Sequence, residues 1–388
     1  CVPSGASTGV HEAIELRDKD LNRYKGKGVL NNIKFINSVI LEALQGLDVR
    51  EQNKIDNILI ELDGTLNKKK LGANTILSVS IAIAKAASKA ENIELYSYLG
   101  GLVSNRLPIP LVNVINGGAH AANNLDIQEY MLAPLGANTF SEAIRWCSEI
   151  FYNLKDILIK NKKSTAVGDE GGFASNFNNN TSPIEYIIKA IKASKLNPEK
   201  DVLISLDVAA TEFYKNKKYF LSSEKRHLNG EEMINYLNML KNKFPIFSIE
   251  DGCAEDDWKN WINLTKRIGN NTLLIGDDLF VTNTRRLHRG IKEKAANGIL
   301  IKPNQIGTLT ETIETINLAK ENSIENIISH RSGETEDSFI ADLCIATNSK
   351  FIKTGSVSRS ERCSKYNRLI YIEKNNPNYC YSGINFNV

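Results

Sequence analysis

The chain contains 388 residues with a formal net charge of +3; 42% of the residues are hydrophobic and 24% are charged. This composition is typical of a globular protein, and the length predicts two domains rather than one. The nearly balanced charge, without a basic stripe interleaved with aromatic residues, argues against nucleic acid as a partner. There is no apolar run of roughly 18 residues and no secretory signal peptide, so we expect neither a membrane span nor secretion.

The N-terminal part of the chain reads mostly as helix. Residues 3–9 are small and lack apolar periodicity, which predicts a mobile loop. Residues 73–87 carry small and apolar side chains on several faces, and a helix that is apolar on all sides is normally buried. An earlier helix is expected from residue 30 onward because apolar residues recur at helical spacing. These are Ile33, Ile36, Ile40 and Leu44.

Glycine and proline cluster between residues 100 and 110, which predicts a boundary between units 1–104 and 105–388. Beyond it, short apolar runs recur and each ends in a charged or potentially charged residue. The successive intervals between these residues are 43, 27, 25, 28 and 23 positions, and an interval near 25 fits one strand, one helix and two turns. The six residues are Asp207, Glu250, Asp277, Lys302, His330 and Lys353.

Continuous apolar strands that alternate with helices, such as the one expected over 311–320, indicate a parallel sheet buried on both faces. A β/α barrel places polar residues at the carboxyl ends of successive strands. A doubly wound open sheet would instead gather its ligands at one switch point, and no G-x-G-x-x-G motif or P-loop occurs. The pattern therefore favours an α/β protein with a C-terminal β/α barrel.

The six strand-end residues divide into an acidic half and a basic half. Three clustered carboxylates without cysteine ligands suit a hard divalent ion, and magnesium is the default. The basic half suits an anionic substrate, and Arg331 together with Ser332 can donate several hydrogen bonds to one phosphate. The alternative is that each carboxylate is an exposed strand end paired with a neighbouring lysine; three carboxylates on successive strands weaken that alternative.

Two glycine-rich segments lie upstream of these strands. One, at 116–120, ends in His120 and precedes Glu129; the other, at 168–172, encloses Glu170. Glycines beside a carboxylate let the backbone and a ligand approach closely, but the same dipeptides form ordinary turns. The residues alone leave open whether Glu170 is functional.

Taken together, these motifs resemble the enolase family, and the resemblance covers nearly the whole chain. The matching segments include 4–9, 71–74, 116–118, 168–172, 248–251, 254–258 and 276–279. The most specific segments are Lys302-Pro-Asn-Gln-Ile-Gly-Thr and Ser329-His-Arg-Ser-Gly-Glu-Thr-Glu-Asp. Departures occur at Ala122, Ser175 and Pro303, none of which is a catalytic position in the match.

The resemblance implies a reaction: reversible dehydration of 2-phosphoglycerate to phosphoenolpyruvate with two Mg²⁺ ions. Lys302 would be the base that removes the carbon-2 proton, with its pKa lowered by burial and nearby cations, and Glu170 the acid that assists loss of the hydroxyl group. The implied substrate contacts are His120, Glu129, Glu250, Asp277, Ser329, His330, Arg331, Ser332 and Lys353. The implied ligands of the first ion are Asp207, Glu250 and Asp277, and Ser7 would bind the second.

The resemblance also implies an eight-stranded barrel with irregular first strands, a small α+β capping domain and a homo-oligomer, either dimer or octamer. The chain opens with Cys1, and the family pattern has a few dozen further residues before the loop at 3–9, so we expect the cap to be truncated. The six cysteines are scattered without a C-x-x-C pair, which argues against a disulfide framework or zinc site and favours the cytoplasm.

Two alternatives stay open at this point. One is another member of the enolase superfamily that acts on a carboxylate without phosphate. The other is a catalytically impaired protein with a binding role, such as a surface receptor or an RNA-processing partner, and a secondary surface pool would leave no mark in the sequence. Intact residues at the matched catalytic positions argue against an inactive protein.

Overall fold

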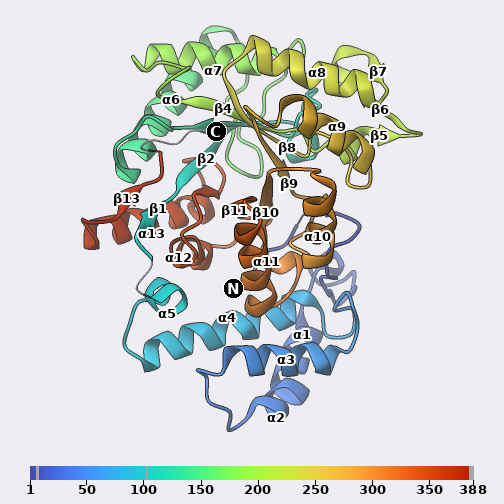
Figure 1. Ribbon diagram of the computed structural model, residues 1–388, viewed down its shortest axis with the longest axis vertical. Helices are drawn as coiled ribbons and strands as arrows, with labels where there is room; N and C mark the ends of the chain where they lie inside the picture. Colours follow the sequence, from blue (N-terminus) through green and yellow to red (C-terminus); the bar gives the residue numbers. More distant parts are fainter. Residues whose placement is uncertain (6–7, 102–103, 384–388) are drawn as a thin grey trace.

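The C-terminal part of the chain closes into an eight-stranded barrel with the strand order β10-β11-β12-β2-β3-β4-β8-β9 (Figure 1). The computed structural model describes residues 1–5, 8–101 and 104–383. The prediction of a β/α barrel preceded by an N-terminal cap is confirmed. The barrel strands are β2 Ile109–Asn116, β3 Glu129–Ala133, β4 Leu203–Asp207, β8 Ile246–Glu250, β9 Leu273–Gly276, β10 Gly298–Ile301, β11 Glu325–Ser329 and β12 Phe351–Lys353.

The six strands expected from apolar runs are all barrel strands, and each ends at or one residue before its charged residue. The two strands that the pattern did not locate, β2 and β3, are also the irregular ones. β3 runs antiparallel to both of its neighbours, β2 and β4, whereas the other adjacent pairs in the barrel are parallel. Because of this reversal, the first residue of β3 lies at the end of the barrel where the other strands finish.

Helices surround the barrel and follow its strands along the chain (Figure 1). Their starts carry local signals: Asn229 and Glu232 form a capping box on α8, and Thr308 caps α11 by accepting from the Glu311 N–H. The helix expected over 311–320 is α11. The barrel helices are α6 Phe140–Lys160, α7 Ser182–Ala193, α8 Gly230–Lys243, α9 Trp258–Ile268, α10 Thr284–Glu293, α11 Leu309–Glu321, α12 Phe339–Ala346 and α13 Ser360–Asn375.

Two small sheets lie outside the barrel. A three-stranded antiparallel sheet occupies much of the 43-residue interval between Asp207 and Glu250, which explains why that interval is longer than the others. Its strands are β5 Tyr214–Lys215, β6 Lys218–Leu221 and β7 Arg226–Leu228. A second sheet pairs β1 Arg106–Leu107 with β13 Cys380–Tyr381.

The cap is built of helices and loops in its described part, and it lies below the barrel in the view of Figure 1. The expected helix from residue 30 is present, with a π-helical turn at Ile36–Ile40. The expected buried helix is α4, in which Ile76 and Leu77 are almost completely buried. The cap helices are α1 Leu30–Phe35, α2 Leu41–Leu44, α3 Gln52–Asp63, α4 Ala73–Ala90 and α5 Leu95–Gly100.

Polar contacts join the cap to the start of α11. The buried carboxylate of Asp56 on α3 accepts hydrogen bonds from the backbone N–H and the hydroxyl of Thr310, at 3.0 and 2.7 Å. Ser80 on α4 accepts from the Leu309 N–H at 3.0 Å. The first N–H groups of a helix have no partner within the helix, so cap side chains complete α11 and fix its position against α3 and α4. No helix in the described residues is long and apolar enough to cross a membrane.

We expect Asp56→Ala to lower the free energy of unfolding by about 1–3 kcal/mol, because the backbone N–H and the hydroxyl of Thr310 lose the Asp56 carboxylate as acceptor. Thermal and urea unfolding followed by circular dichroism measure the change. Asp156→Ala on α6 is the control, because Asp156 is exposed. Equal effects of the two substitutions would contradict the role given to Asp56.

Candidate active site

The strand register brings carboxylates side by side at one end of the barrel. Across neighbouring strands, Glu129 of β3 pairs with Asp207 of β4, and Asp207 pairs with Glu250 of β8. Asp277 follows β9, which is the next strand around the barrel. These four carboxylates are 1–8% exposed. The alternative of exposed strand ends is therefore wrong, although the carboxylates do pair with lysines.

Lys353 lies at the centre of this carboxylate cluster. Its Nζ is 2.9 Å from Glu129 Oε1, from Asp207 Oδ2 and from both oxygens of Glu250. Lys353 ends β12, which faces β8 across the barrel because three strands separate the two on either side. The ammonium therefore ties opposite walls of the barrel together.

The charged groups of this cluster shift one another's pKa values. Burial alone would lower the pKa of Lys353, but Asp207, Glu129 and Glu250 raise it well above the ordinary range, so the ammonium keeps its proton. Burial raises the pKa of Glu250 well above its ordinary range, and the negative charge of Asp207 acts in the same direction. A site with more negative than positive groups in a buried setting favours an added cation.

Lys302 projects from the turn after β10 toward Asp277, and its Nζ contacts the Asp277 carboxylate. Burial would lower the pKa of Lys302, but the negative charge of Asp277 raises it above the ordinary value. The expectation of a lowered pKa is therefore wrong for this arrangement of side chains, because the ion pair outweighs burial. Pro303 holds Lys302 in an extended conformation, as its ring restricts the preceding residue.

Glu170 lies between two histidines and lines the same cavity as Lys302. Its carboxylate oxygens are 3.4 Å from His120 Nδ1 and 3.4 Å from His330 Nε2, and Asn113 Nδ2 donates to it at 3.1 Å. Burial would raise the pKa of Glu170, but the charge of His120 lowers it well below the ordinary range. Burial also lowers the pKa of His120, yet Glu170 raises it overall, so the two form an ion pair.

The pKa of Glu129 is shifted in the opposite direction from that of Glu170, although the two residues are neighbours. One ligand atom each from His120, Glu129 and Glu170 lie within 4.8 Å of one another. Burial raises the pKa of Glu129 well above its ordinary range, and the negative charge of Glu170 acts in the same direction. The pKa values of these two neighbouring buried carboxyl groups are therefore shifted in opposite directions.

Arg331 forms a two-pronged ion pair with a residue of the cap. Its guanidinium nitrogens donate to the Glu12 carboxylate at 2.9 and 3.1 Å, and one of them also donates to Asn304 Oδ1 at 3.2 Å. Glu12 further accepts from the Gly9 N–H at 3.0 Å. The guanidinium of Arg331, which the sequence analysis assigned to a phosphate, thus binds a carboxylate of the cap in this structure.

The structure places two of the three serines predicted for the site, Ser329 and Ser332, but does not describe the third, Ser7. The Ser329 hydroxyl donates to the His330 carbonyl at 3.0 Å, and Ser332 lines the cavity beside Arg331. Ser7 lies outside the described residues, so its role as a metal ligand stays a prediction. Nearby, Ser4 and Gly333 exchange backbone hydrogen bonds of 2.9 and 2.8 Å, which attach this part of the predicted loop to the barrel.

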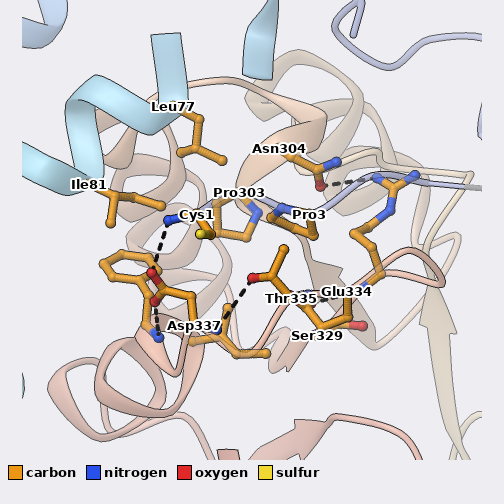
Figure 2. Close-up of a pocket in the computed structure, with 13 residues that line it drawn as sticks. Cys1, Pro3, Leu77, Ile81, Pro303, Asn304, Ser329, Glu334, Thr335 and Asp337 are labelled. Atoms are coloured by element: carbon orange, nitrogen blue, oxygen red, sulfur yellow. Dashed lines mark hydrogen bonds and ion pairs between the residues drawn. The ribbon is translucent and has the colours of Figure 1, made fainter. Parts of the chain in front are cut away.

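Three cavities share Arg331 as a lining residue, and one of them is formed mainly by cap residues such as Ser4, Glu12 and Arg17. The second is lined by His120, Glu170, Lys302, Lys353 and further polar residues. The third lies between α4 and the barrel, where Leu77 and Ile81 face Pro3 and Pro303 (Figure 2). The polar cavity holds the residues with reactive chemistry, whereas the apolar one belongs to the junction of cap and barrel.

Sequence reasoning missed several residues that hold the site together. Gln128 Nε2 donates to Asp207 at 3.3 Å and Gln305 Nε2 donates to Asp277 at 2.9 Å. Gln128 precedes Glu129 and Gln305 lies within the segment that begins at Lys302, but a neutral amide does not by itself indicate a functional role. Asn113 leaves a weak trace, as a polar residue inside an apolar strand, and Glu12 leaves none because its partner is 319 positions away.

The first predicted metal site, formed by Asp207, Glu250 and Asp277, is held together by lysines in this structure. Asp207 and Glu250 share the ammonium of Lys353, while Asp277 turns toward Lys302. Among the described residues, the carboxylate group whose ligand atoms lie within 4.8 Å of one another is Asp251, Asp277 and Asp278. The predicted ligand set therefore stays a prediction, with oxygen donors of the type that Mg²⁺ prefers.

Comparison with known families gives two matches that together span nearly all of the chain. A family described as "Enolase, N-terminal domain" matches residues 1–99. A family described as "Enolase, C-terminal TIM barrel domain" matches residues 104–388. Both the cap and the barrel that carries the site are thus covered.

We expect Lys353→Met to lower the free energy of unfolding at pH 8 by about 3–5 kcal/mol, because three carboxylates lose their buried counter-charge. Lys353 lowers the pKa values of Glu129 and Glu250, so without it these already raised values rise further, and the folded variant gains more stability than the wild type as pH falls. The deficit should therefore shrink at pH 5. Urea unfolding with chelator at both pH values measures it.

Lys259→Met is the matched control, since Lys259 is exposed on α9. A deficit for Lys353→Met that stays constant with pH would contradict the charge-compensation role of Lys353.

Proposed function

Because the chain belongs to the enolase family, we propose that it catalyses the reversible dehydration of 2-phosphoglycerate to phosphoenolpyruvate. Family membership makes it a lyase of the enolase superfamily; the substrate and the mechanism are the proposal. The observation that supports it best is one buried cavity that places a lysine, two carboxylic acids and an anion-binding arginine within reach of a small molecule. These are Lys302, Glu129, Glu170 and Arg331.

Lys302 is proposed as the base that takes the carbon-2 proton on Nζ. It must first be neutral, and its contact with Asp277 opposes this by raising its pKa. Whatever neutralises Asp277 removes the cause of that shift, after which burial favours the neutral amine. A cation on Asp277 and a reactive Lys302 are therefore electrostatically linked.

The Glu129–Glu170 pair is proposed as the acid. When the carbon-2 proton leaves to Lys302, the carbon–oxygen bond at carbon 3 breaks, the double bond forms, and a proton from the pair leaves with the hydroxyl group as water. The pKa of Glu129 is raised and that of Glu170 is lowered, and both residues lie within the same cluster. Two carboxylates with separated pKa values suit an acid that must be protonated near neutral pH.

The phosphate is proposed to bind at Arg331 and Ser332, and the substrate carboxylate at Lys353. Arg331 binds the Glu12 carboxylate through two nitrogens, which supports the binding of another anion with paired oxygens. A phosphate at this fork would compete with Glu12 and so act on the cap residues that follow the loop at 3–9.

Two Mg²⁺ ions are proposed, and the oxygen donors fit the first of them. Asp207, Glu250 and Asp277 would hold it, and the excess of buried negative charge that raises the pKa of Glu250 is the observation in favour. Magnesium in such a site supplies Lewis-acid stabilisation of the charge that develops on the substrate carboxylate. Ser7 is proposed for the second ion.

We also propose that the protein forms a homo-oligomer and is located in the cytoplasm. All six cysteines are free, as expected for a chain that relies on no disulfide. Sedimentation velocity would distinguish monomer, dimer and octamer.

The direct test is the ultraviolet absorbance of phosphoenolpyruvate formed from 2-phosphoglycerate, with magnesium and then with chelator. We expect turnover that requires magnesium. Absence of turnover by folded, metal-loaded protein, together with proton exchange on a non-phosphorylated hydroxy acid, would favour another reaction of the superfamily. Absence of both would favour a binding role.

Paired variants separate the base from the acid. Lys302→Ala should abolish exchange of the carbon-2 proton with solvent, while Glu170→Gln should retain exchange and lose dehydration by about 10²–10⁴-fold. Nuclear magnetic resonance of 2-phosphoglycerate in deuterated buffer measures the exchange. Magnesium affinity, measured by calorimetry, should not fall in Lys302→Ala, because the Lys302 ammonium competes with a cation for Asp277. Undiminished exchange in that variant would remove Lys302 as the base.

A further inference from the structure

A buried guanidinium behind the active site has no role in the reaction described so far. Arg362 lies in the first turn of α13 and is 1% exposed. It donates to His330 Nδ1 at 2.7 Å and to the backbone carbonyls of Arg331, Ser332 and Asp169. Each acceptor belongs to, or adjoins, a residue of the proposed site.

We propose that Arg362 is a positioning residue that fixes the tautomer of His330 and clamps the Glu170 turn to the His330–Ser332 turn, an inference that rests on the proposed function. Its two NH groups reach both turns at once: NH1 binds His330 and the Arg331 carbonyl, and NH2 binds the Asp169 and Ser332 carbonyls. The two turns are far apart in sequence, and Arg362 bonds to both.

The tautomer follows from the chemistry of the two side chains. A guanidinium has only N–H donors and stays protonated in proteins. His330 Nδ1 must therefore accept, so it carries no proton. In the neutral ring the proton then lies on Nε2, which is 3.4 Å from Glu170 Oε1. Arg362 thus leaves His330 as a neutral ring with its N–H on Nε2, the nitrogen nearer to the Glu170 carboxylate.

The electrostatics agree with a neutral ring. Burial lowers the pKa of His330 well below the ordinary value, and the positive charge of Arg362 acts in the same direction against the opposing charge of Glu170. His120, on the other oxygen of Glu170, has a raised pKa instead. Glu170 therefore lies between two imidazoles whose pKa values are shifted in opposite directions, and Arg362 helps to keep His330 neutral.

The backbone around Arg362 is shaped for a guanidinium. Gly355 follows β12 with φ +81°, and a Cβ at this position would lie 2.7 Å from Arg362 Cδ and 3.0 Å from the Glu170 carbonyl. Glycine therefore makes room for the arginine stem at a conformation that other residues rarely adopt. A lysine would leave most of the four acceptors without a donor, because it lacks the planar fork.

The primary test reads the tautomer directly in the wild-type protein. Histidine labelled with ¹⁵N in the ring distinguishes protonated from unprotonated nitrogens by nuclear magnetic resonance, and the signals lost in His330→Gln assign the ring. We expect His330 to show Nε2–H and bare Nδ1 from pH 6 to 8. A ring protonated on Nδ1, or on both nitrogens, would overturn the proposal.

The second test uses Arg362→Lys, with Arg368→Lys on the same helix as control. Arg368 pairs with Asp342 and Glu94 rather than with site residues. Arg362→Lys should mix the His330 tautomers and lower kcat by about 10²-fold with little change in KM, since misplaced groups act on the chemical step. Arg368→Lys should leave the His330 signals and kcat unchanged.

Rescue separates positioning from general stability. Arg362→Ala should regain part of its kcat when methylguanidinium is added at concentrations that do not unfold the wild-type protein. A folded Arg362→Lys with the wild-type tautomer and wild-type kcat would overturn the proposal. The tautomer readout needs no turnover, so a failure of the proposed reaction would be seen separately, in the phosphoenolpyruvate assay.

Discussion

The structure of the barrel mouth depends on the burial of one ammonium group among three carboxylates. Lys353 reaches from β12 to Glu129, Asp207 and Glu250 on β3, β4 and β8, with each contact at 2.9 Å. None of these charges is stable alone at 1–3% exposure. The opposite charges compensate one another only in part. The remaining excess of carboxylates suits a divalent cation.

The reversed strand β3 makes this arrangement possible. In an all-parallel barrel, the first residue of the second strand would lie at the far end from the active site. Because β3 is antiparallel, Glu129 instead lies beside Asp207 in register, close to Glu170 and within reach of Lys353. The irregular start of the barrel thus adds the carboxyl group whose pKa is raised in the proposed acid pair.

Arginines connect the mouth to the surrounding structure in two directions. Arg331 binds Glu12 of the cap through both guanidinium nitrogens, whereas Arg362 binds the turns beneath His330 and Glu170 from α13. The planar fork of arginine suits both tasks, because each requires several acceptors at fixed angles. The reactive side chains are thereby held by the cap through Arg331 and by the outer helix α13 through Arg362.

Apolar runs ending in a charged residue were enough to locate six barrel strands and to predict that Asp207, Glu250, Asp277, Lys302, His330 and Lys353 gather at one end, because parallel strands in a barrel finish on the same side. The partners of these residues depend on contacts between distant segments. Only the tertiary structure reversed β3, brought Glu12 to Arg331 and Arg362 to His330, and raised rather than lowered the pKa of Lys302. Local patterns record which side chains end a strand, whereas pairing and pKa depend on distances across the barrel that no local pattern encodes.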